Sequence, residues 1–580
     1  MTAEGTDAAG IDAQDAGTET VDVVVVGAGG AGLAAALTAA SKGLKTVLIE
    51  KSPYWGGSTS RSGGGVWIPN NSVLRRDGVV DTPEQARKYA HAIIGEHAPA
   101  ERIDTYINRG PEALDYLIEH SPLALEWVKG YSDYYPEAPG GLVGGRSVEP
   151  KPFDARVLGD DLATLHPQYT KAPLNMVVLQ SDYKWMNVGL RHWRGAAKMA
   201  KVAARFTWSK ARNKKMIAMG AALAAELLIG CRQAGVDIRL STPLNSLVTE
   251  DGKVVGVRAG GEGDERVIRA RYGVILGSGG FEHNADMRAE YQRAPIGTEW
   301  TTGAPSNTGD GIRAAQEVGA DVSLMDDAWW GPTIPLPKGP WFALSERNVP
   351  GTFMVNQQGE RFMNESLPYV EAGHRMYGGD FGQGEGEGAN IPAWLVMDQR
   401  CRNRYLFAGL PARQPIPKSW LSSGAVVKAG TITELAEKMG VPVDTLVATT
   451  ERFNGFARSG VDADFQRGVS GYDNYYGDPT NKPNPNLGPV DKAPFYAVKM
   501  VPGDLGTKGG VDTDVAGRAL RADGSVIDGL YASGNTSAPV MGHTYAGPGA
   551  TIGPAVVFGY LAALDVVEKA KNANVSHAGA

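Results

Sequence analysis

The feature that most constrains the fold is a glycine turn between two buried strands near the start of the chain. Val21–Val26 is a run of five valines around one aspartate, and Gly27–Gly32 follows it at once. Leu33–Lys42 has the composition of a helix, and Leu44–Ile49 is a second strand that ends at the acidic residue Glu50. Strand, turn, helix, strand and acid in this order predict a Rossmann-like unit, whose turn and helix amino terminus receive a pyrophosphate.

A second stretch of small and hydroxylic residues follows that acid. Glu50-Lys51 leads into Gly56–Ser60 and then Ser62–Gly65. A run of this kind, directly after the ribose-binding acid, suits a ligand that extends along the sheet edge. We therefore expect FAD rather than NAD, bound without a covalent link because no histidine or cysteine anchor is evident.

The far end of the chain returns to the same glycine-rich character. Gly529–Thr536 reads as a strand and a turn, and Tyr545–Gly549 follows nine residues later, before a predicted helix over 551–570. Both ends of the chain are thus predicted to meet at one cofactor. The pattern also sets a single tyrosine beside a glycine-rich turn where the reactive ring of that cofactor is expected.

Length and patterning together predict a discontinuous α/β domain. The chain has 580 residues, too many for one compact core. We expect a disordered tail at 1–20, a Rossmann-like FAD-binding domain of the glutathione-reductase type formed by 21–325 and 495–580, and an inserted α+β catalytic domain at 326–494. Within them we predict a hairpin over 240–257, a hairpin-like turn over 353–362, and helices over 216–230, 433–439 and 444–457.

Composition excludes several classes of function. The net charge of −7 argues against a general nucleic-acid binder. The two cysteines, Cys231 and Cys401, form no CxxC motif, and the nine histidines show no metal-ligand spacing, so no metal site is expected. The first twenty residues lack the features of a signal peptide, which favours a reducing cytoplasm.

A basic segment fits neither domain. Residues 191–215 contain nine Lys and Arg residues and no acid. Five of these residues recur at intervals of three and four, on one face of a helix: Arg191, Arg194, Lys198, Lys201 and Arg205. We expect either peripheral contact with the inner face of an anionic membrane or a solvated helix that covers the domain junction.

These motifs resemble the 3-ketosteroid Δ1-dehydrogenases, flavoproteins related to the fumarate reductase class. The resemblance extends over nearly the whole chain and weakens over about 140–215. Besides the amino-terminal glycine turn and Glu50, it rests on Gly56–Ser60, Asn364–Tyr369, Gly506–Gly510 and Tyr545–Gly549. The resemblance implies FAD, a 3-ketosteroid substrate and an external electron acceptor, quinone-like or other.

Residue roles follow from the resemblance position by position. Tyr369 is expected to abstract the C2 proton with help from Tyr134, and the flavin N5 to accept hydride from C1. The hydroxyl of Tyr545 and the N–H of Gly549 are expected to hold the C3 ketone oxygen. The predicted cofactor-binding residues are Gly27, Ala28, Gly29, Gly30, Ala31, Gly32, Glu50, Lys51, Gly57, Ser58, Thr59, Ser62, Gly63, Gly64, Val248, Gly277, Ser278, Gly279, Asn307, Asp310, Gly534, Asn535, Ala550 and Ile552.

Elementary chemistry supports these roles and leaves alternatives open. A C–H next to a ketone becomes acidic only if the enolate oxygen is stabilised, which a tyrosine and a glycine N–H can do. The stretch 545–553 contains no basic residue, unlike a dicarboxylate site. The remaining alternatives are a Δ4-(5α)-dehydrogenase or other ketone desaturase, a dicarboxylate reductase, and a membrane-docked flavin electron-transfer protein. His543 is interpreted as structural.

Overall fold

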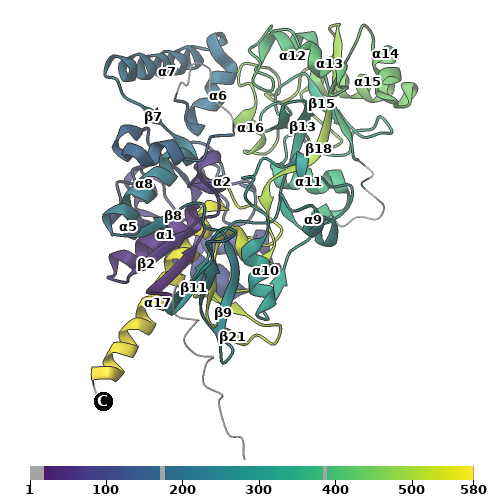
Figure 1. Cartoon of the computed structure of the whole chain (residues 1–580). Helices are drawn as coiled ribbons and strands as arrows, with labels where there is room; N and C mark the ends of the chain where they lie inside the picture. The colour runs from purple at the N-terminus through teal and green to yellow at the C-terminus, as the bar shows by residue number, and fades with distance from the viewer. Residues whose placement is uncertain (1–17, 170–176, 383–387, 389, 579–580) are drawn as a thin grey trace, which may run out of the picture.

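Two sheets and the helices around them organise the molecule (Figure 1). The computed structural model describes residues 18–169, 177–382, 388 and 390–578. The first sheet has the strand order β20-β21-β11-β1-β2-β8, and the hairpin β9–β10 pairs with β11. Its strands are β1 Glu19–Val26, β2 Thr46–Ile49, β8 Asp237–Arg239, β9 Leu244–Glu250, β10 Lys253–Ala259, β11 Arg266–Leu276, β20 Arg518–Leu520 and β21 Val526–Ala532.

The first sheet is a Rossmann-like parallel sheet, as predicted. β1 runs parallel to β2 and β11, and β11 runs parallel to β21, so strands from both ends of the chain share one sheet. Alternate valines of β1 enter two different hydrophobic cores, which explains why the strand is apolar on both faces. The hairpin predicted over 240–257 is confirmed, with its turn at Asp251-Gly252.

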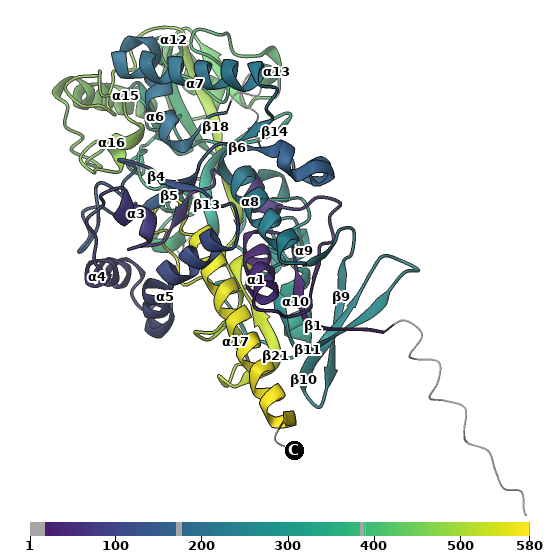
Figure 2. The same cartoon turned by 90° about the vertical axis from the view of Figure 1, so that its left-hand side faces the viewer.

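Helices α1 (Gly30–Ser41), α8 (Met219–Gln233) and α17 (Ile552–Ala578) pack together on one side of this sheet. The prediction of a buried helix near 216–230 and of a final helix is confirmed. In Figure 2, α17 runs from the lower end of the molecule, where the chain ends, up to its centre, where the helix begins. The carboxy-terminal segment is therefore placed to deliver residues 545–552 to the junction between the two sheets.

The second sheet is antiparallel and has the order β14-β13-β18-β16-β15, with β17 beside β18. Its strands are β13 Ala328–Leu336, β14 Gly339–Phe342, β15 Thr352–Val355, β16 Ala393–Asp398, β17 Val426–Ala429 and β18 Phe495–Thr507. Strand β18 begins at the predicted boundary of 495 but pairs with β13, β16 and β17 rather than with the first sheet. Residues 495–507 thus belong by hydrogen bonding to the catalytic side, because the chain crosses back only after Thr507. The other domain limits stay a prediction.

Two local predictions are wrong. The hairpin-like pattern over 353–362 forms its turn, but β15 pairs with β16 and no strand follows the turn. Arg361 instead forms ion pairs with Glu365 and Asp462, which hold the chain away from a hairpin path. The predicted tail of 1–20 also ends too late, since β1 begins at Glu19 and pairs with β11; residues 1–17 lie outside the described residues.

The remaining elements surround the two sheets. The helices are α2 Gly57–Arg61, α3 Ser72–Arg76, α4 Pro83–Ile94, α5 Ala100–Glu119, α6 Gln180–Val188, α7 Trp193–Ala211, α9 Ala285–Tyr291, α10 Asp310–Glu317, α11 Tyr369–Tyr377, α12 Gln399–Arg404, α13 Lys418–Ser422, α14 Ile432–Met439, α15 Val443–Ser459 and α16 Asp473–Tyr476. The short strands are β3 Val66–Trp67, β4 Leu125–Trp127, β5 Ser147–Pro150, β6 Phe153–Asp154, β7 Met216–Ile217, β12 Val322–Ser323 and β19 Gly510–Val511. In the described ranges no helix combines the length and apolar character that crossing a bilayer requires.

The basic helix is real, but its predicted face is not free. α7 lies with α6 at one edge of the molecule (Figure 1). Lys198 and Arg205 both contact the fully buried carboxylate of Asp182 on α6, at 2.7 and 3.4 Å. Arg191 pairs with Asp478 at 3.1 Å. Two of the five residues on the predicted face therefore join α7 to α6, and a third, Arg191, joins this segment to the rest of the protein.

Candidate active site

The predicted phosphate turn forms where β1 and β11 end side by side. Gly27 has φ of +102°, and a Cβ there would lie 2.4 Å from the carbonyl oxygen of Gly277. A Cβ on Gly29 would meet nothing within 4 Å, so open space lies in front of the turn. Gly29 also caps α1 without any side-chain hydrogen bond. Apart from the N–H of Gly30, which the Thr59 hydroxyl accepts, the first N–H groups of α1 are thus available to an anionic ligand.

The acid at the end of β2 closes this turn. Glu50 accepts hydrogen bonds from the N–H groups of Ala28 (2.8 Å) and Ser52 (2.9 Å). Burial raises the pKa of Glu50 above its ordinary value, although these two hydrogen bonds oppose the shift. Each carboxylate oxygen keeps a further lone pair. The residue can therefore serve the loop and a ribose hydroxyl together.

Most of the predicted cofactor residues form one connected cradle. The Thr59 hydroxyl accepts from the Gly30 N–H at 3.0 Å, and the Ser58 hydroxyl accepts from the Asn307 amide at 3.1 Å. Lys51 and Asp310 form an ion pair at 2.5 Å. Hydrogen bonds also join Ser62 to Thr59 and Gly64, Ser278 to Thr536, and Asn535 to Trp329. A Cβ added at Gly57, Gly63, Gly279 or Gly534 would lie within 3.6 Å of Gly29, Gln180, Asn307 or Ala31, respectively. Ala550 and Ile552 are buried around the start of α17.

The strand pairing places Val248 away from this cradle, beside the first half of β11. It pairs with Gly256 on β10, and Gly256 pairs with Arg269 in the first half of β11. The glycine turn lies instead at the other end of β11, after Leu276. The role of Val248 in holding the cofactor stays a prediction.

The cradle fits FAD in the chemistry of its donors. It offers the amino terminus of α1, where Thr59 occupies only the Gly30 N–H, a carboxylate after β2, and hydroxyls on α2 that continue the same edge. Gly534, at the end of β21, has a φ of +67°, and its Cβ would contact Ala31 of α1 at 3.1 Å. The two ends of the chain thus meet at one elongated nucleotide site, as the sequence indicates.

Three predicted tyrosines lie together where the two sheets join. Tyr134 comes from the loop after β4, Tyr369 begins α11, and Tyr545 precedes α17; each is at most 5% exposed. The ring centroids of Tyr134 lie 5.5 Å from those of Tyr369 and 5.2 Å from those of Tyr545. Tyr369 and Tyr545 are 5.3 Å apart. The rings of Tyr134 and Tyr545 thus both pack against that of Tyr369.

Gly549 places its N–H beside the hydroxyl of Tyr545. The N–H groups of Gly549 and Thr551 lie near the Tyr545 oxygen and oppose the rise of its pKa, and the hydroxyl of Thr551 lies 3.4 Å from it. Gly549 has φ of +96°, and a Cβ there would lie 2.2 Å from the carbonyl oxygen of Gly65. Only glycine fits this turn, and the turn gathers a hydroxyl and N–H donors at one buried point. Such a pair of donors suits a developing oxyanion.

Burial strongly affects these phenols. It raises the pKa of Tyr134 and of Tyr369 well above the ordinary value of 10.0, and the neighbouring phenols add to the shift. Burial also raises the pKa of Tyr545. The three residues are therefore neutral hydrogen-bond donors in the resting site. Proton abstraction needs a means of stabilising a phenolate.

The sequence reasoning missed a buried polar cluster behind Tyr545. Asp327 accepts from Lys508 (2.9 Å) and contacts His374 (2.9 Å) and His543 (2.8 Å). Burial opposes the ionisation of Asp327, but Lys508 and the histidines hold its pKa well below the ordinary value. The motif 506–510 includes Lys508, but nothing in its spacing indicates Asp327. His543 has the structural role expected of it.

This cluster is no metal site: the described residues include no group of three or more His, Cys, Asp or Glu placed to hold a metal ion. It lies directly behind the tyrosines. The ammonium of Lys508 lies 4.8 Å from the ring of Trp329, which packs at 5.2 Å against Tyr545. Because Asp327 neutralises Lys508, the tyrosine site gains no free positive charge from it.

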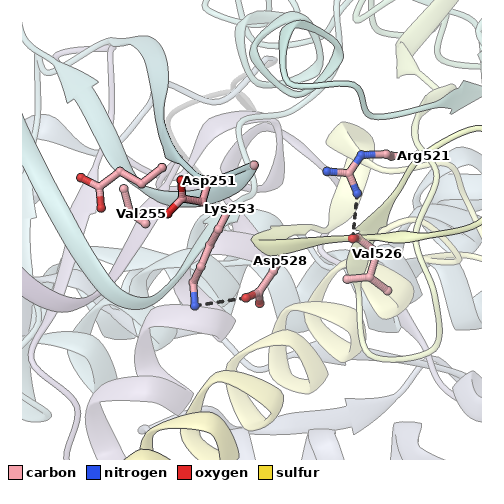
Figure 3. A pocket seen from close by; sticks show the side chains of 8 residues that line it. Asp251, Lys253, Val255, Arg521, Val526 and Asp528 are labelled. Atoms are coloured by element: carbon pink, nitrogen blue, oxygen red, sulfur yellow. Dashed lines mark hydrogen bonds and ion pairs between the residues drawn. The ribbon is translucent and has the colours of Figure 1, made fainter.

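A charged hollow of about 540 Å³ lies at the other end of the first sheet (Figure 3). It is lined by Glu250, Asp251, Gly252, Lys253, Val255, Arg521, Val526 and Asp528. Val526 and Asp528 lie at the beginning of β21, whereas the cradle lies where β21 ends. The lining, with its Lys253–Asp528 ion pair at 3.1 Å, is unsuited to an apolar ligand.

Comparison with known proteins agrees with this cofactor cradle. A family model described as the FAD binding domain matches residues 22–552. The match covers most of the chain, and so the class is that of an FAD-binding flavoprotein.

Individual relatives narrow the class. The chain is 65% identical to a 3-oxosteroid 1-dehydrogenase of Mycolicibacterium smegmatis, over 95% of this chain and 97% of the relative. It is 63% identical to one of Mycobacterium tuberculosis, over 95% and 98%. The crystal structure of 3-ketosteroid Δ1-dehydrogenase from Sterolibacterium denitrificans in complex with 1,4-androstadiene-3,17-dione matches with a TM-score of 0.89 and 36% identity, over 95% of this chain and 100% of that chain. The chain therefore belongs to the 3-oxosteroid 1-dehydrogenase family.

Proposed function

We propose that the protein desaturates the C1–C2 bond of 3-ketosteroids with FAD as oxidant, converting a 3-keto-4-ene into a 3-keto-1,4-diene. The observation that carries this proposal is the buried contact of Tyr134, Tyr369 and Tyr545 beside the N–H of Gly549. These groups are the ones that removal of a proton next to a ketone requires. They lie where both ends of the chain close the flavin cradle.

In this proposal Tyr545 and Gly549 hold the C3 ketone oxygen. When the C2–H bond breaks, negative charge moves to that oxygen as the enolate forms. Two donors already in place stabilise this charge without reorganisation, and losing one such donor costs about 3 kcal/mol of barrier. The ring of Trp329, 5.2 Å from Tyr545, fixes the donor's orientation.

Tyr369 takes the C2 proton in this proposal, and Tyr134 hydrogen-bonds its hydroxyl. Tyr369 begins α11 and packs against Phe342 at 5.2 Å, so its ring has little freedom. FAD, when bound, accepts the hydride that leaves C1. An external acceptor, quinone-like or of another class, then takes the electrons.

An uncharged substrate is favoured over a dicarboxylate. Behind Tyr545, Lys508 packs on Trp329, and its charge is matched by Asp327 at 2.9 Å. A dianion held at Tyr545 would therefore gain no free counter-charge from Lys508, and burying it there would cost free energy. A Δ4-(5α)-dehydrogenase or another ketone desaturase shares the same chemical needs, and product analysis separates these.

The test of the proposed function is the product. Holoenzyme supplied with androst-4-ene-3,17-dione and an artificial electron acceptor is expected to form the 1,4-diene. Formation of no 1,4-diene, or turnover of succinate or of a 5α-reduced steroid in its place, contradicts the proposal. Measurement of all three substrates on one preparation distinguishes these outcomes from an inactive sample.

We further propose that α6 and α7 contact the inner face of an anionic membrane, with the protein in the cytoplasm. Although three basic residues are engaged internally, the segment from α6 to α7 carries exposed apolar side chains: Tyr183, Leu190, Trp193, Met199 and Trp208. Arg194 lies over Trp193, and Arg212 and Lys214 over Trp208, so cations flank the aromatic rings. Aromatic and basic residues together suit a lipid headgroup region.

Vesicles of phosphatidylglycerol test this contact. Replacing Trp193 and Trp208 by alanine is expected to release the protein from them, whereas Val80→Ala, at a site 85% exposed elsewhere, is expected to have no effect. Wild-type protein that fails to bind the vesicles contradicts the membrane proposal. That result leaves the enzymatic proposal unaffected.

A further inference from the structure

The tyrosine pair that removes the proton is part of a longer chain of hydroxyls. The hydroxyl of Tyr134 lies 3.4 Å from that of Tyr131, which lies 2.7 Å from that of Tyr476. Tyr131 follows β4 and Tyr476 ends α16, and both are buried. The hydroxyls of Tyr134, Tyr131 and Tyr476 thus form one connected set with no charged group in it, and the ring of Tyr369 packs against its Tyr134 end at 5.5 Å.

A buried guanidinium faces this set. Arg347 is fully buried and donates to the carbonyl oxygens of Ala343, Glu365 and Leu367. No carboxylate forms an ion pair with it in the described residues, and its Nη2 has no hydrogen-bond partner there. Its charge acts instead on Tyr472, Tyr134 and Tyr131, as well as on Asp473.

Arg347 is an exception to a general rule. Buried charges are normally paired, because an isolated one is expensive to remove from water. The nearby carboxylate of Asp473 is occupied by the amide of Asn364 (2.9 Å) and the N–H of Gly468 (2.8 Å). The hydroxyl of Tyr472 lies beside the Arg347 guanidinium, and the ring of Tyr472 packs 4.7 Å from that of Tyr134. A phenolate formed in this group of tyrosines would give the cation a further counter-charge.

We propose that Tyr131, Tyr476 and Arg347 are positioning residues that let the Tyr369–Tyr134 pair hold one negative charge and so act as the base. The two outer hydroxyls donate along the chain towards the charge, and Arg347 supplies the counter-charge. The inference rests on the proposed function, because only an enzyme that removes a proton next to a ketone needs this base. It explains how phenols whose pKa burial raises can accept a proton.

The step balances without a further reactant. The C2–H bond breaks, and the proton forms an O–H bond with the Tyr369 phenolate. The electron pair of the broken C2–H bond becomes the C2–C3 double bond of the enolate. The π pair of the ketone moves to the oxygen that Tyr545 and Gly549 hold. In the reverse direction the same phenol returns a proton to C2, so solvent deuterium can enter C2 through the hydroxyl chain.

Other groups near the chain are few, and they define the control. Besides its three members and Tyr369, the titratable and charged groups that face the hydroxyls are Tyr472, Tyr475, Tyr545, Arg347 and Asp473. Tyr475 stacks on Tyr131 at 4.0 Å, but its hydroxyl donates to the carbonyl oxygen of Gln180 at 3.4 Å. Tyr475→Phe therefore removes a buried hydroxyl next to the chain without interrupting it.

The experiment measures exchange of the C2 protons of androst-4-ene-3,17-dione with deuterium by NMR, on anaerobically reduced holoenzyme, as a function of pD. Reduced flavin cannot accept hydride, so exchange reports the proton step alone. Tyr131→Phe and Tyr476→Phe are expected to shift the rising limb of the rate–pD profile to higher pD by about one pD unit. At a fixed pD on that limb, exchange would then be about tenfold slower than in the wild type. Tyr475→Phe is expected to follow the wild type.

Arg347 is tested by charge. Arg347→Gln is expected to move the limb further than Tyr476→Phe does, and Arg347→Lys to restore part of the shift. The ultraviolet difference absorbance of tyrosinate, taken for each protein against the same protein carrying Tyr369→Phe, gives a second readout of the ionisation at this site. If Arg347→Gln does not fold, Tyr131→Phe and Tyr476→Phe still decide the proposal.

The outcomes separate the two claims. Profiles for Tyr131→Phe and Tyr476→Phe that coincide with that of Tyr475→Phe overturn the inference and leave the proposed function standing. Wild-type enzyme that neither exchanges C2 nor forms a 1,4-diene overturns the proposed function itself. If all three tyrosine variants exchange C2 protons more slowly but keep the pD dependence of the wild type, the hydroxyls act only through packing. That result also overturns the inference.

Discussion

At the scale of single residues, Gly549 is a position of the site where the backbone leaves no room for a side chain. Replacement by alanine would place a Cβ 2.2 Å from the backbone of Gly65, at a φ of +96°. The turn must shift, and the N–H moves from the ketone oxygen. We predict that Gly549→Ala lowers the rate of steroid turnover by about 100-fold or more. Gly455→Ala, where a Cβ meets nothing within 4 Å, is the matched control and should keep the wild-type rate.

Tyr545 tests the second donor. Tyr545→Phe keeps the ring between Tyr134 and Trp329 but removes the hydroxyl. We predict a fall in turnover of about 100-fold, with FAD absorbance and thermal unfolding close to the wild type. A rate within about twofold of the wild type would remove Tyr545 from the oxyanion site.

Sequence alone reaches part of this site. The glycine turn, Glu50 and Asn307 could be predicted because each follows a strand or opens a helix in a local pattern. The three tyrosines lie in segments more than 170 residues apart in places, so only resemblance to a family brings them together. Lys508 and Asp327 are separated in the same way, and Arg347 shows no local pattern at all. Contacts of this kind depend on the tertiary fold.

At the scale of elements, the contrast between two predicted hairpins shows what local pattern can decide. The hairpin β9–β10 closes on itself through a two-residue turn, Asp251-Gly252, so its signal lies within one stretch. The turn after β15 has a similar signal, yet β15 pairs with β16, about forty residues further on. Pairing with a distant strand buries more apolar surface, and no local rule detects it.

The attachment of α7 depends on Asp182. This carboxylate is fully buried and contacts Lys198 and Arg205, which are partly exposed. We predict that Asp182→Asn destabilises the α6–α7 segment by about 2–3 kcal/mol, because two cations lose their counter-charge. Faster hydrogen exchange confined to residues 180–211 is the expected observation.

The control for this prediction is an exposed pair. Asp264→Asn removes an ion pair with Arg266 whose side chains are mostly exposed, so stability should change by less than about 0.5 kcal/mol. Unchanged exchange in Asp182→Asn would show that apolar packing holds α7 without the buried carboxylate.

At the scale of the whole molecule, α8 carries a buried acid that links stability to pH. Glu226 is 2% exposed, and burial raises its pKa to about 8. Between its unfolded pKa and about pH 8 the folded protein keeps a proton that the unfolded chain releases, so stability falls as pH rises. We predict that Glu226→Gln stabilises the protein by about 2–4 kcal/mol more at pH 8 than at pH 5. Denaturant unfolding at the two pH values measures this difference, and equal effects would contradict a buried neutral carboxyl.

The last part of the chain, from β18 to α17, contributes to both sheets and so builds much of the site. β21 closes the first sheet, β18 completes the second, and the turn before α17 delivers Tyr545 and Gly549 to the junction. In the proposed reaction, cofactor and substrate meet where the two ends of the chain converge. That reaction depends on Tyr369 acting there as the base.

One measurement tests that claim most directly: anaerobic mixing of holoenzyme with androst-4-ene-3,17-dione while the flavin absorbance is followed, for the wild type and for Tyr369→Phe. We expect the wild-type flavin to bleach as the 1,4-diene forms. We expect Tyr369→Phe to bind FAD normally, but its flavin should not bleach on the same timescale. Bleaching of the variant at the wild-type rate, or a wild-type flavin that stays oxidised, would contradict that claim.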